Sequence, residues 1–204
     1  LSVGVCNSLP KLVAKRLIEP AIALSDRPRL VCHEEKTSDL LTRLQHHELD
    51  VVLSDSPAPP GAAPRVFNHL LGECGTTFFA AKEIAGRIRS GFPGSLTGKP
   101  MLLPSTGAAV RQLIDQWLDQ KEIRPDIVAE FDDTALLKVF GQDGLGVFPA
   151  PAVVADSVCK QYDVEIVGTV PALKERFYAV SAERRVKHPA VLAICNAARR
   201  DLFA

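Results

Sequence analysis

Two short polar turns carry the residues best suited to hold a ligand. The first, Asn7, Ser8 and Leu9, follows the apolar run that opens the chain, and the second, Ser105, Thr106 and Gly107, follows another apolar run. Each turn is predicted to start a helix, where unpaired backbone N–H groups and hydroxyls can hold an anion or a polar group. Two such turns in two lobes predict a ligand cleft between the lobes. The alternative is that each turn only caps its helix.

Two further polar clusters extend this set. Thr37 and Ser38 are predicted to start another helix, and in a doubly wound sheet such turns gather at the carboxyl ends of the strands. Asp55 and Ser56 follow a predicted buried strand, and their oxygens would suit a cation, whereas a solvated loop is the other interpretation. The apolar wall of the pocket is predicted to contain Phe131, Phe148 and Pro149, with core packing as the alternative for the phenylalanines.

The composition points away from several other functions. Lys and Arg number 24, as do Asp and Glu, and the resulting zero net charge argues against direct binding of nucleic acid. Five scattered cysteines predict neither a disulfide framework nor a zinc site, which fits a reducing cytoplasm. Hydrolase, metalloprotease and nucleotide-binding motifs are missing, so no catalytic residue, metal or cofactor is predicted. His46 and His47 are either pH sensors or ordinary surface histidines.

No apolar run approaches the roughly 18 to 20 residues of a membrane span, and no membrane partner is expected. The chain opens on a strand without an initiator Met, which we interpret as a fragment of a longer protein.

Strands and helices alternate in the first third of the chain, which predicts βαβ units and a parallel sheet. Pro20 is expected to kink or restart the first helix, and Thr37 or Ser38 to cap the second. A rigid loop is predicted over residues 57–61. The predicted strands are residues 2–6, 28–34 and 50–54, and the predicted helical segments are 11–18 and 20–24 and a helix containing Leu40, Leu41 and Leu44.

The rest of the chain shows the same alternation. The clearest helix has apolar residues at helical spacing, Val110, Leu113, Ile114, Trp117 and Leu118. Asp132 or Asp133 is predicted to cap a helix that buries Leu136, Leu137 and Phe140. The other predicted strands are residues 76–80, 127–131, 144–149, 164–167 and 176–181, and the other helices are 82–90 and 189–203.

This order resembles the effector-binding domain of LysR-type transcriptional regulators. Two stretches also match that family, the helix end at residues 44–50 and the glycine-flanked strand at 144–149. The resemblance implies an α/β fold of two Rossmann-like lobes joined by two crossover strands, like type 2 periplasmic binding proteins. Lobe I would be residues 1–72 plus 168–204, and lobe II residues 73–167. It further implies an effector in the cleft, a homodimer or tetramer, and DNA contact only through an N-terminal domain absent here.

Within the family, residues 17–20, 29–32 and 53–61 are similar to activators of sodium/proton antiporter genes, which implies a response to sodium or pH. The function predicted is therefore effector sensing and oligomerisation in a cytoplasmic regulator. Two alternatives remain open: an exported solute-binding protein of the same architecture, and an enzyme that uses the Asp55 region. The sequence leaves open the effector, which can be a small molecule or an ion, the surfaces that form the dimer, and the target genes.

Overall fold

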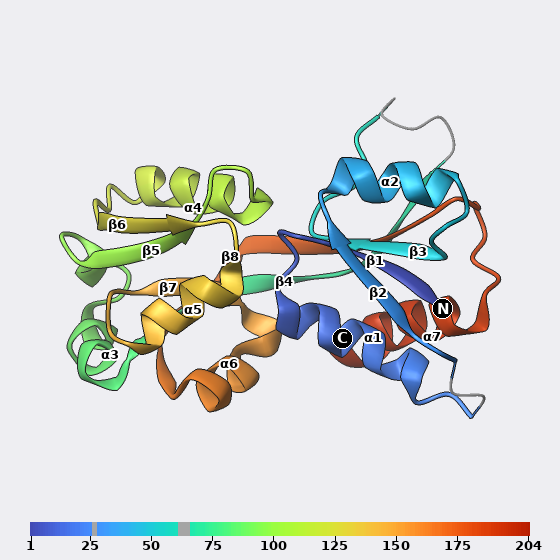
Figure 1. Cartoon of the computed structure of the whole chain (residues 1–204). Coiled ribbons are helices and arrows are strands. Elements are labelled where there is room, and N and C mark those ends of the chain that lie inside the picture. Colours follow the sequence, from blue (N-terminus) through green and yellow to red (C-terminus); the bar gives the residue numbers. More distant parts are fainter. Residues whose placement is uncertain (26–27, 61–65) are drawn as a thin grey trace. The chain divides into compact units, whose positions relative to one another are not determined.

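The computed structural model describes residues 1–25, 28–60 and 66–204, and the chain has an α/β fold (Figure 1). It divides into two compact units, Leu1–Glu73 with Arg176–Ala204, and Cys74–Glu175. Strands β4 (Phe67–Ala81) and β8 (Val164–Ser181) each contribute residues to both units. Among the described residues, none of the helices has the length and apolar character that a membrane crossing requires.

The first unit is built around strand β1 (Ser2–Cys6). This strand lies parallel to β2 (Val31–Glu35) on one side and to β3 (Val51–Ser54) on the other, and β8 pairs antiparallel with β3. Parallel strands need cover on both faces because neither face can be left to water. Helix α2 (Thr37–Gln45) covers one face, and α1 (Lys11–Ile22) and α7 (Pro189–Ala197) cover the other (Figure 1).

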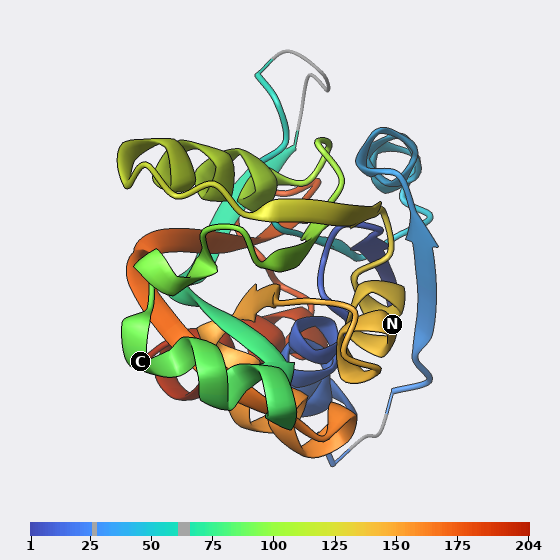
Figure 2. The same ribbon diagram turned by 90° about the vertical axis from the view of Figure 1, so that its left-hand side faces the viewer.

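The second unit contains two groups of strands. Strand β7 (Phe148–Pro151) pairs antiparallel with β4, and β5 (Pro100–Pro104) pairs parallel with β6 (Asp126–Phe131). Figures 1 and 2 show helix α4 on one side of the β5 and β6 pair and α5 on the other. The helices of this unit are α3 (Lys82–Ile88), α4 (Ala109–Gln120), α5 (Thr134–Gln142) and α6 (Ala155–Tyr162).

Aromatic packing fills the core of the second unit. The ring of Trp117, on the apolar stripe of α4, stacks on Phe78 of β4 at a centroid distance of 5.5 Å, and Phe92 packs against both rings. Ile114 and Leu118 from the same stripe are also buried. The predicted helical stripe therefore faces the core, although its residues Val110 and Leu113 are only half-buried.

Several predicted element bounds were wrong. Helix α1 is one continuous helix with Pro20 inside it, because the lost hydrogen bond falls in its last turn and the buried Leu17, Ile18 and Ala21 hold that turn in place. The two predicted strands at 164–167 and 176–181 are one long strand, β8. The helices predicted at 82–90 and 189–203 end earlier and continue as short turns, 3-10 at Arg89–Gly91 and π at Ala198–Leu202.

Three bounds on the strands also differ. Strand β2 begins at Val31 and not at residue 28, β4 begins at Phe67 and not at residue 76, and the strand predicted at 144–149 is Phe148–Pro151. Further short 3-10 turns occur at Gly94–Leu96 and Ala152–Val154. Of the predicted loop at residues 57–61, Gly61 lies outside the described residues.

The predicted buried face of α5 was right for Leu137 and wrong for Leu136 and Phe140. Leu136 and Phe140 are 47% and 41% exposed, whereas the helix buries Leu137, Lys138 and Gly141. Gly141 explains the difference, because a Cβ atom at this position would lie 2.1 Å from Cδ1 of Phe148. The absent side chain lets the helix approach the Phe148 ring on the glycine face, and the larger apolar side chains turn outward.

Candidate functional site

The turn after β1 holds its serine hydroxyl against a carboxylate. Asn7 is exposed, Ser8 is half-buried and Leu9 is buried. The N–H groups of Asn7 and Leu9 donate to the carbonyls of Glu35 and Cys6, at 3.2 and 2.9 Å. Helix α1 has Pro10 as its N-cap residue, without a side-chain cap. The capping alternative is therefore not realised by Ser8, whose Oγ donates to Oδ1 of Asp55 at 2.8 Å.

Asp55 joins this turn because β1 and β3 are adjacent parallel strands whose carboxyl ends meet at one edge. Its side chain is half-buried, and burial raises its pKa, an effect that the hydrogen bond from Ser8 opposes. Ser56 is tied into the same loop, since its N–H donates to Oγ of Ser54 at 3.2 Å. The structure thus brings together two clusters that the sequence placed 47 residues apart.

Helix α2 contributes one of its two predicted residues to this edge. Oγ1 of Thr37 is hydrogen-bonded to the thiol of Cys6. The sulfur of Cys6 also accepts a hydrogen bond from Oγ of Ser54 at 3.8 Å. Ser38 is exposed, and its hydroxyl donates to the neighbouring Asp39. The prediction that Thr37 or Ser38 caps this helix was wrong: Lys36 is the N-cap residue and no side chain caps it.

Sequence reasoning missed Cys6 as a member of this cluster. It is buried, and it lies at the end of β1 with Thr37 and Ser54 around its sulfur. Its position as the last residue of a strand before a polar turn was the available signal. A small apolar residue with a weak donor and acceptor is suited to this place between two hydroxyls.

The second unit repeats the pairing of serine with aspartate. The N–H of Ser105 donates to the carbonyl of Phe131 at 2.9 Å, and its hydroxyl donates to the carboxylate of Asp132. Thr106 and Gly107 are exposed. Helix α4 has Ala108 as its N-cap residue without a side-chain cap, so capping is again not what Ser105 does. Asp133 caps α5 by accepting from the N–H of Ala135 at 2.7 Å, as predicted.

The three predicted wall residues lie in different surroundings. Phe131 is half-buried at the end of β6 and stacks on Phe140 with a centroid distance of 5.3 Å. Phe148 is fully buried and stacks on Phe79, which is the core packing that the sequence left open. Pro149 is a buried residue of β7, opposite Phe78 of β4. Of the three, Phe131 has the exposure that contact with a ligand in this structure needs.

A buried arginine supports the turn of the second unit. Arg111 of α4 donates from Nη1 to the carbonyl of Pro104, the residue before Ser105, at 2.9 Å. Its Nε lies 2.9 Å from both carboxylate oxygens of Asp115, and its Nη2 lies 2.9 Å from Oε1 of Glu130 in β6. These bonds raise the pKa of Arg111, with Glu130 as the largest cause. Sequence reasoning missed it, although an arginine three residues before Ile114 on an apolar stripe was a visible signal.

Each unit therefore presents a serine hydroxyl that donates to an aspartate at the carboxyl end of a neighbouring parallel strand. A carboxylate has several acceptor sites, so one such bond does not saturate it. These edges suit a ligand with N–H or O–H donors or with positive charge. In the part of the chain that the structure describes, no three His, Cys, Asp or Glu side chains are grouped to hold a metal ion.

The chain is similar to known transcription regulators. A family model described as LysR substrate binding domain matches residues 1–202. The transcriptional activator protein NhaR of Escherichia coli (strain K12) is 30% identical over 202 residues, which are 99% of this chain and 66% of that protein. The chain thus spans slightly less than two thirds of the length of this relative.

Solved structures share the fold. The apo regulatory domain of HypT from Salmonella typhimurium has a TM-score of 0.71 at 14% identity, covering 97% of this chain and 94% of that one. The regulatory domain of CcmR from Synechocystis PCC6803, in complex with 2-PG, has a TM-score of 0.72 at 14% identity, covering 100% and 99%. The prediction of an α/β fold of the type 2 periplasmic-binding-protein kind is confirmed by these likenesses.

Proposed function

Because the chain belongs to the LysR substrate binding domain family, we propose that it senses its effector through the turns after β1 and β5 and signals within a longer regulator. The family comprises transcription regulators and not enzymes, and the chain is the effector-binding domain of such a regulator. This favours the regulator over an exported solute-binding protein. In our proposal the regulator acts in the cytoplasm and contacts DNA through a domain other than this one.

The paired serines and aspartates are the observation that carries the choice of effector site. Ser8 with Asp55, and Ser105 with Asp132, place a hydroxyl and a carboxylate at the strand ends of each unit. The proposed site also takes in the residues that lie in the same turns or strand ends, Asn7, Leu9, Thr37, Ser56, Thr106, Gly107 and Phe131. We leave out Ser38, whose hydroxyl donates to Asp39, and the buried Phe148 and Pro149. A predicted cleft between the units stays a prediction.

The effector in this proposal carries hydrogen-bond donors or positive charge. A carboxylate at each turn repels anions and accepts from N–H and O–H groups. Sodium is one such effector, since carboxylate and hydroxyl oxygens are ligands for hard cations. The similarity of residues 17–20, 29–32 and 53–61 to activators of sodium/proton antiporter genes supports a sodium or pH response and control of such a gene. The activator NhaR is 30% identical to this chain.

Self-association is the second part of the proposal. Leu136, Val139 and Phe140 of α5 are between 41% and 47% exposed, and Ile127 and Val128 of the neighbouring β6 are each 42% exposed. Large apolar side chains exposed on a helix and on its neighbouring strand are a common mark of an interaction site. We therefore propose that α5 and β6 contact a second copy of this chain in a dimer or tetramer.

Thermal unfolding with candidate effectors tests the sensing proposal. The 204-residue chain is titrated with sodium, lithium and potassium chloride, with small amines and with small carboxylates, because a bound effector raises the melting temperature by mass action. We expect the stabilising compound to lose its effect in Ser8→Ala and in Ser105→Ala. Ser38→Ala is the matched control, because this exposed serine also lies at a helix start but its hydroxyl donates to the neighbouring Asp39 and not to an aspartate at a strand end.

The outcome in the two variants decides the proposal. Equal stabilisation of the parent chain, Ser8→Ala and Ser105→Ala by the same compound would remove both turns from effector binding. If the compound no longer stabilises one of these two variants but still stabilises the other, the site is restricted to one unit, which contradicts the joint role of the two turns. If the compound stabilises none of the three variants Ser8→Ala, Ser105→Ala and Ser38→Ala, the cause is a general destabilisation of the chain, and this result also counts against the proposal.

A further inference from the structure

The sheet of the first unit ends in an open strand edge. Strand β4 lies next to β8, and its other neighbour, β7, pairs with it only at Thr76–Phe79. Residues Phe67–Glu73 of β4, which we call the β4 edge, belong to the first unit and have a strand on one side alone among the described residues. Phe67 and Leu70 are 36% and 45% exposed there, so apolar side chains accompany the open side of the strand.

The carbonyl of Leu70 shows which backbone groups point away from β8. It accepts a hydrogen bond from Nε of Arg199 at 3.1 Å, so it is directed out of the sheet. Along a strand the N–H and C=O of one residue point to the same side, and the side alternates from residue to residue. The N–H of Leu70 and both backbone groups of Asn68 are therefore directed outward as well. Neither residue makes a backbone hydrogen bond outside the ladder in the part of the chain that the structure describes.

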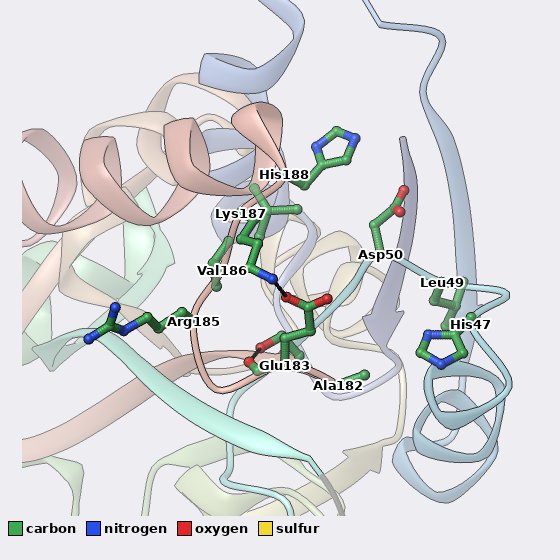
Figure 3. A pocket seen from close by; sticks show the side chains of 11 residues that line it. His47, Leu49, Asp50, Ala182, Glu183, Arg185, Val186, Lys187 and His188 are labelled. Carbon is green, nitrogen blue, oxygen red and sulfur yellow. Dashed lines mark hydrogen bonds and ion pairs between the residues drawn. The ribbon is translucent and has the colours of Figure 1, made fainter.

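Two arginines near this edge have charges that no described carboxylate neutralises. Arg199 binds Leu70 through Nε alone, and neither Arg199 nor Arg185 forms an ion pair with a described residue. Figure 3 shows how Arg185 is kept unpaired, since Glu183 is paired with Lys187 and Arg185 extends away from both and from the pocket beside them. Both arginine side chains are exposed and can reach a partner.

His69 of the β4 edge links these arginines to the strand. Its Nε2 lies 2.8 Å from Oγ of Ser181, the last residue of β8, and Arg185 lies in the bend that follows. Burial and then the charge of Arg199 lower the pKa of His69, which shows that this charge acts on the strand. Residues 176–204 contain six Lys or Arg and two Asp or Glu, so this end of a neutral chain is cationic.

An open edge beside arginines suits an acidic strand better than other occupants. Edge-to-edge pairing of two copies of this chain would bring like charges together, which destabilises a strand pair. Duplex DNA would use the positive charges but has no peptide backbone to add to a sheet. An extended acidic segment of another protein uses both features, because its backbone pairs with the edge and its carboxylates pair with guanidinium groups.

We propose that the β4 edge binds an extended acidic segment of a partner protein as an added β-strand. The backbone of that segment pairs with the outward groups of Asn68 and Leu70, and its carboxylates pair with Arg199 and Arg185. Arg199 thereby exchanges a bond to a neutral carbonyl for one in which both partners are charged, which is the stronger type. An apolar side chain of the segment lies against the exposed Leu70. This surface gives the regulator a docking point for a protein, separate from its effector turns.

Fluorescence anisotropy of a labelled, end-capped peptide of Glu-Val repeats, titrated with the 204-residue chain, tests this inference. Alternation places the carboxylates on one face of the added strand and the valines on the other. Saturable binding of this peptide is expected. A Lys-Val peptide should bind more weakly by about tenfold or more because its charge is reversed. A Glu-Pro peptide of the same charge should be weaker to the same extent, because proline lacks the N–H that a ladder needs.

Substitutions in the chain separate charge from strand pairing. Arg199→Gln and Arg185→Gln are each expected to weaken binding of the Glu-Val peptide by about tenfold, through the loss of one ion pair. Arg87→Gln is their matched control, because Arg87 is exposed and without an ion pair to a described residue but lies in the second unit. Leu70→Pro removes the outward N–H and leaves the ladder with β8, so it should also weaken binding, whereas Leu70→Val should bind as the parent does.

Four results would overturn the inference. The first is the absence of saturable binding of the Glu-Val peptide up to millimolar concentrations. The second is equal affinity for the Glu-Pro peptide, which would show charge recognition without strand pairing and which decides this point even if Leu70→Pro does not fold. The third is tighter binding of a short DNA duplex than of the peptide, which would assign the surface to phosphates. The fourth is unchanged affinity in both Arg199→Gln and Arg185→Gln while each variant melts as the parent does. None of these results bears on Ser8 or Ser105, so the effector proposal is decided separately.

Discussion

Replacing Arg111 by methionine should cost the domain a large part of its stability. The side chain is 8% exposed and bonds to Asp115, Glu130 and the carbonyl of Pro104. Breaking a fully buried ion pair costs about 3 to 5 kcal/mol, and an exposed pair contributes about 0 to 1 kcal/mol. Asp115 and Glu130 are 43% and 42% exposed and can regain water, so the expected loss lies between these limits, at about 3 kcal/mol.

The assay is urea unfolding at constant m-value, together with thermal unfolding. A loss of about 3 kcal/mol corresponds to a melting temperature lower by roughly 6 to 12 °C for a chain of this size. Arg124→Met is the matched control, because Arg124 pairs with Asp119 at the same 2.9 Å while their side chains are 66% and 74% exposed. It should change stability by less than about 0.5 kcal/mol. Equal losses in the two variants would refute the argument that burial makes the Arg111 network important.

Three further perturbations test other parts of the structure. Burial raises the pKa of Asp55, so its ionised form is disfavoured in the folded state and stability should fall as pH rises through that pKa. Asp55→Asn should remove this slope in a plot of melting temperature against pH. An unchanged slope in the variant would contradict the assignment to Asp55. Gly141→Ala should destabilise by about 1 to 3 kcal/mol in urea unfolding, because its Cβ would overlap Phe148, whereas Gly107→Ala, which has open space, should not. Leu136→Glu should weaken self-association in sedimentation without lowering the melting temperature, because that side chain is 47% exposed; undiminished association would remove α5 from the interface.

Local patterns in the sequence predicted the order of the elements well, because they depend on nearby residues. The stripe that includes Ile114 and Trp117 predicted a helix and its buried face, and Asp133 predicted a cap. The two serine turns were also predicted from local signals. Their partners were not, because the contact of Ser8 with Asp55 depends on which strands are neighbours in the sheet.

The errors have a common physical cause, since each depends on a contact made elsewhere in the fold. Periodicity assigned Leu136 and Phe140 to the core, but the closest approach of α5 is set by Gly141 against Phe148. Propensity placed a break at Pro20, but buried neighbours keep α1 continuous. An arginine such as Arg111 is assigned to the surface by its charge until its carboxylate partners are known.

The two serine turns also show why capping and binding are separable in this domain. Had Ser8 and Ser105 capped α1 and α4, their hydroxyls would have been occupied by backbone N–H groups, and the helix starts would have been the natural place for an anion. Instead both hydroxyls donate to carboxylates. A cation or a donor group beside Asp55 would favour its ionised form and offset the cost of its burial. Binding of such an effector and loss of the Asp55 proton are then coupled, so the affinity for it must rise with pH as that carboxyl ionises.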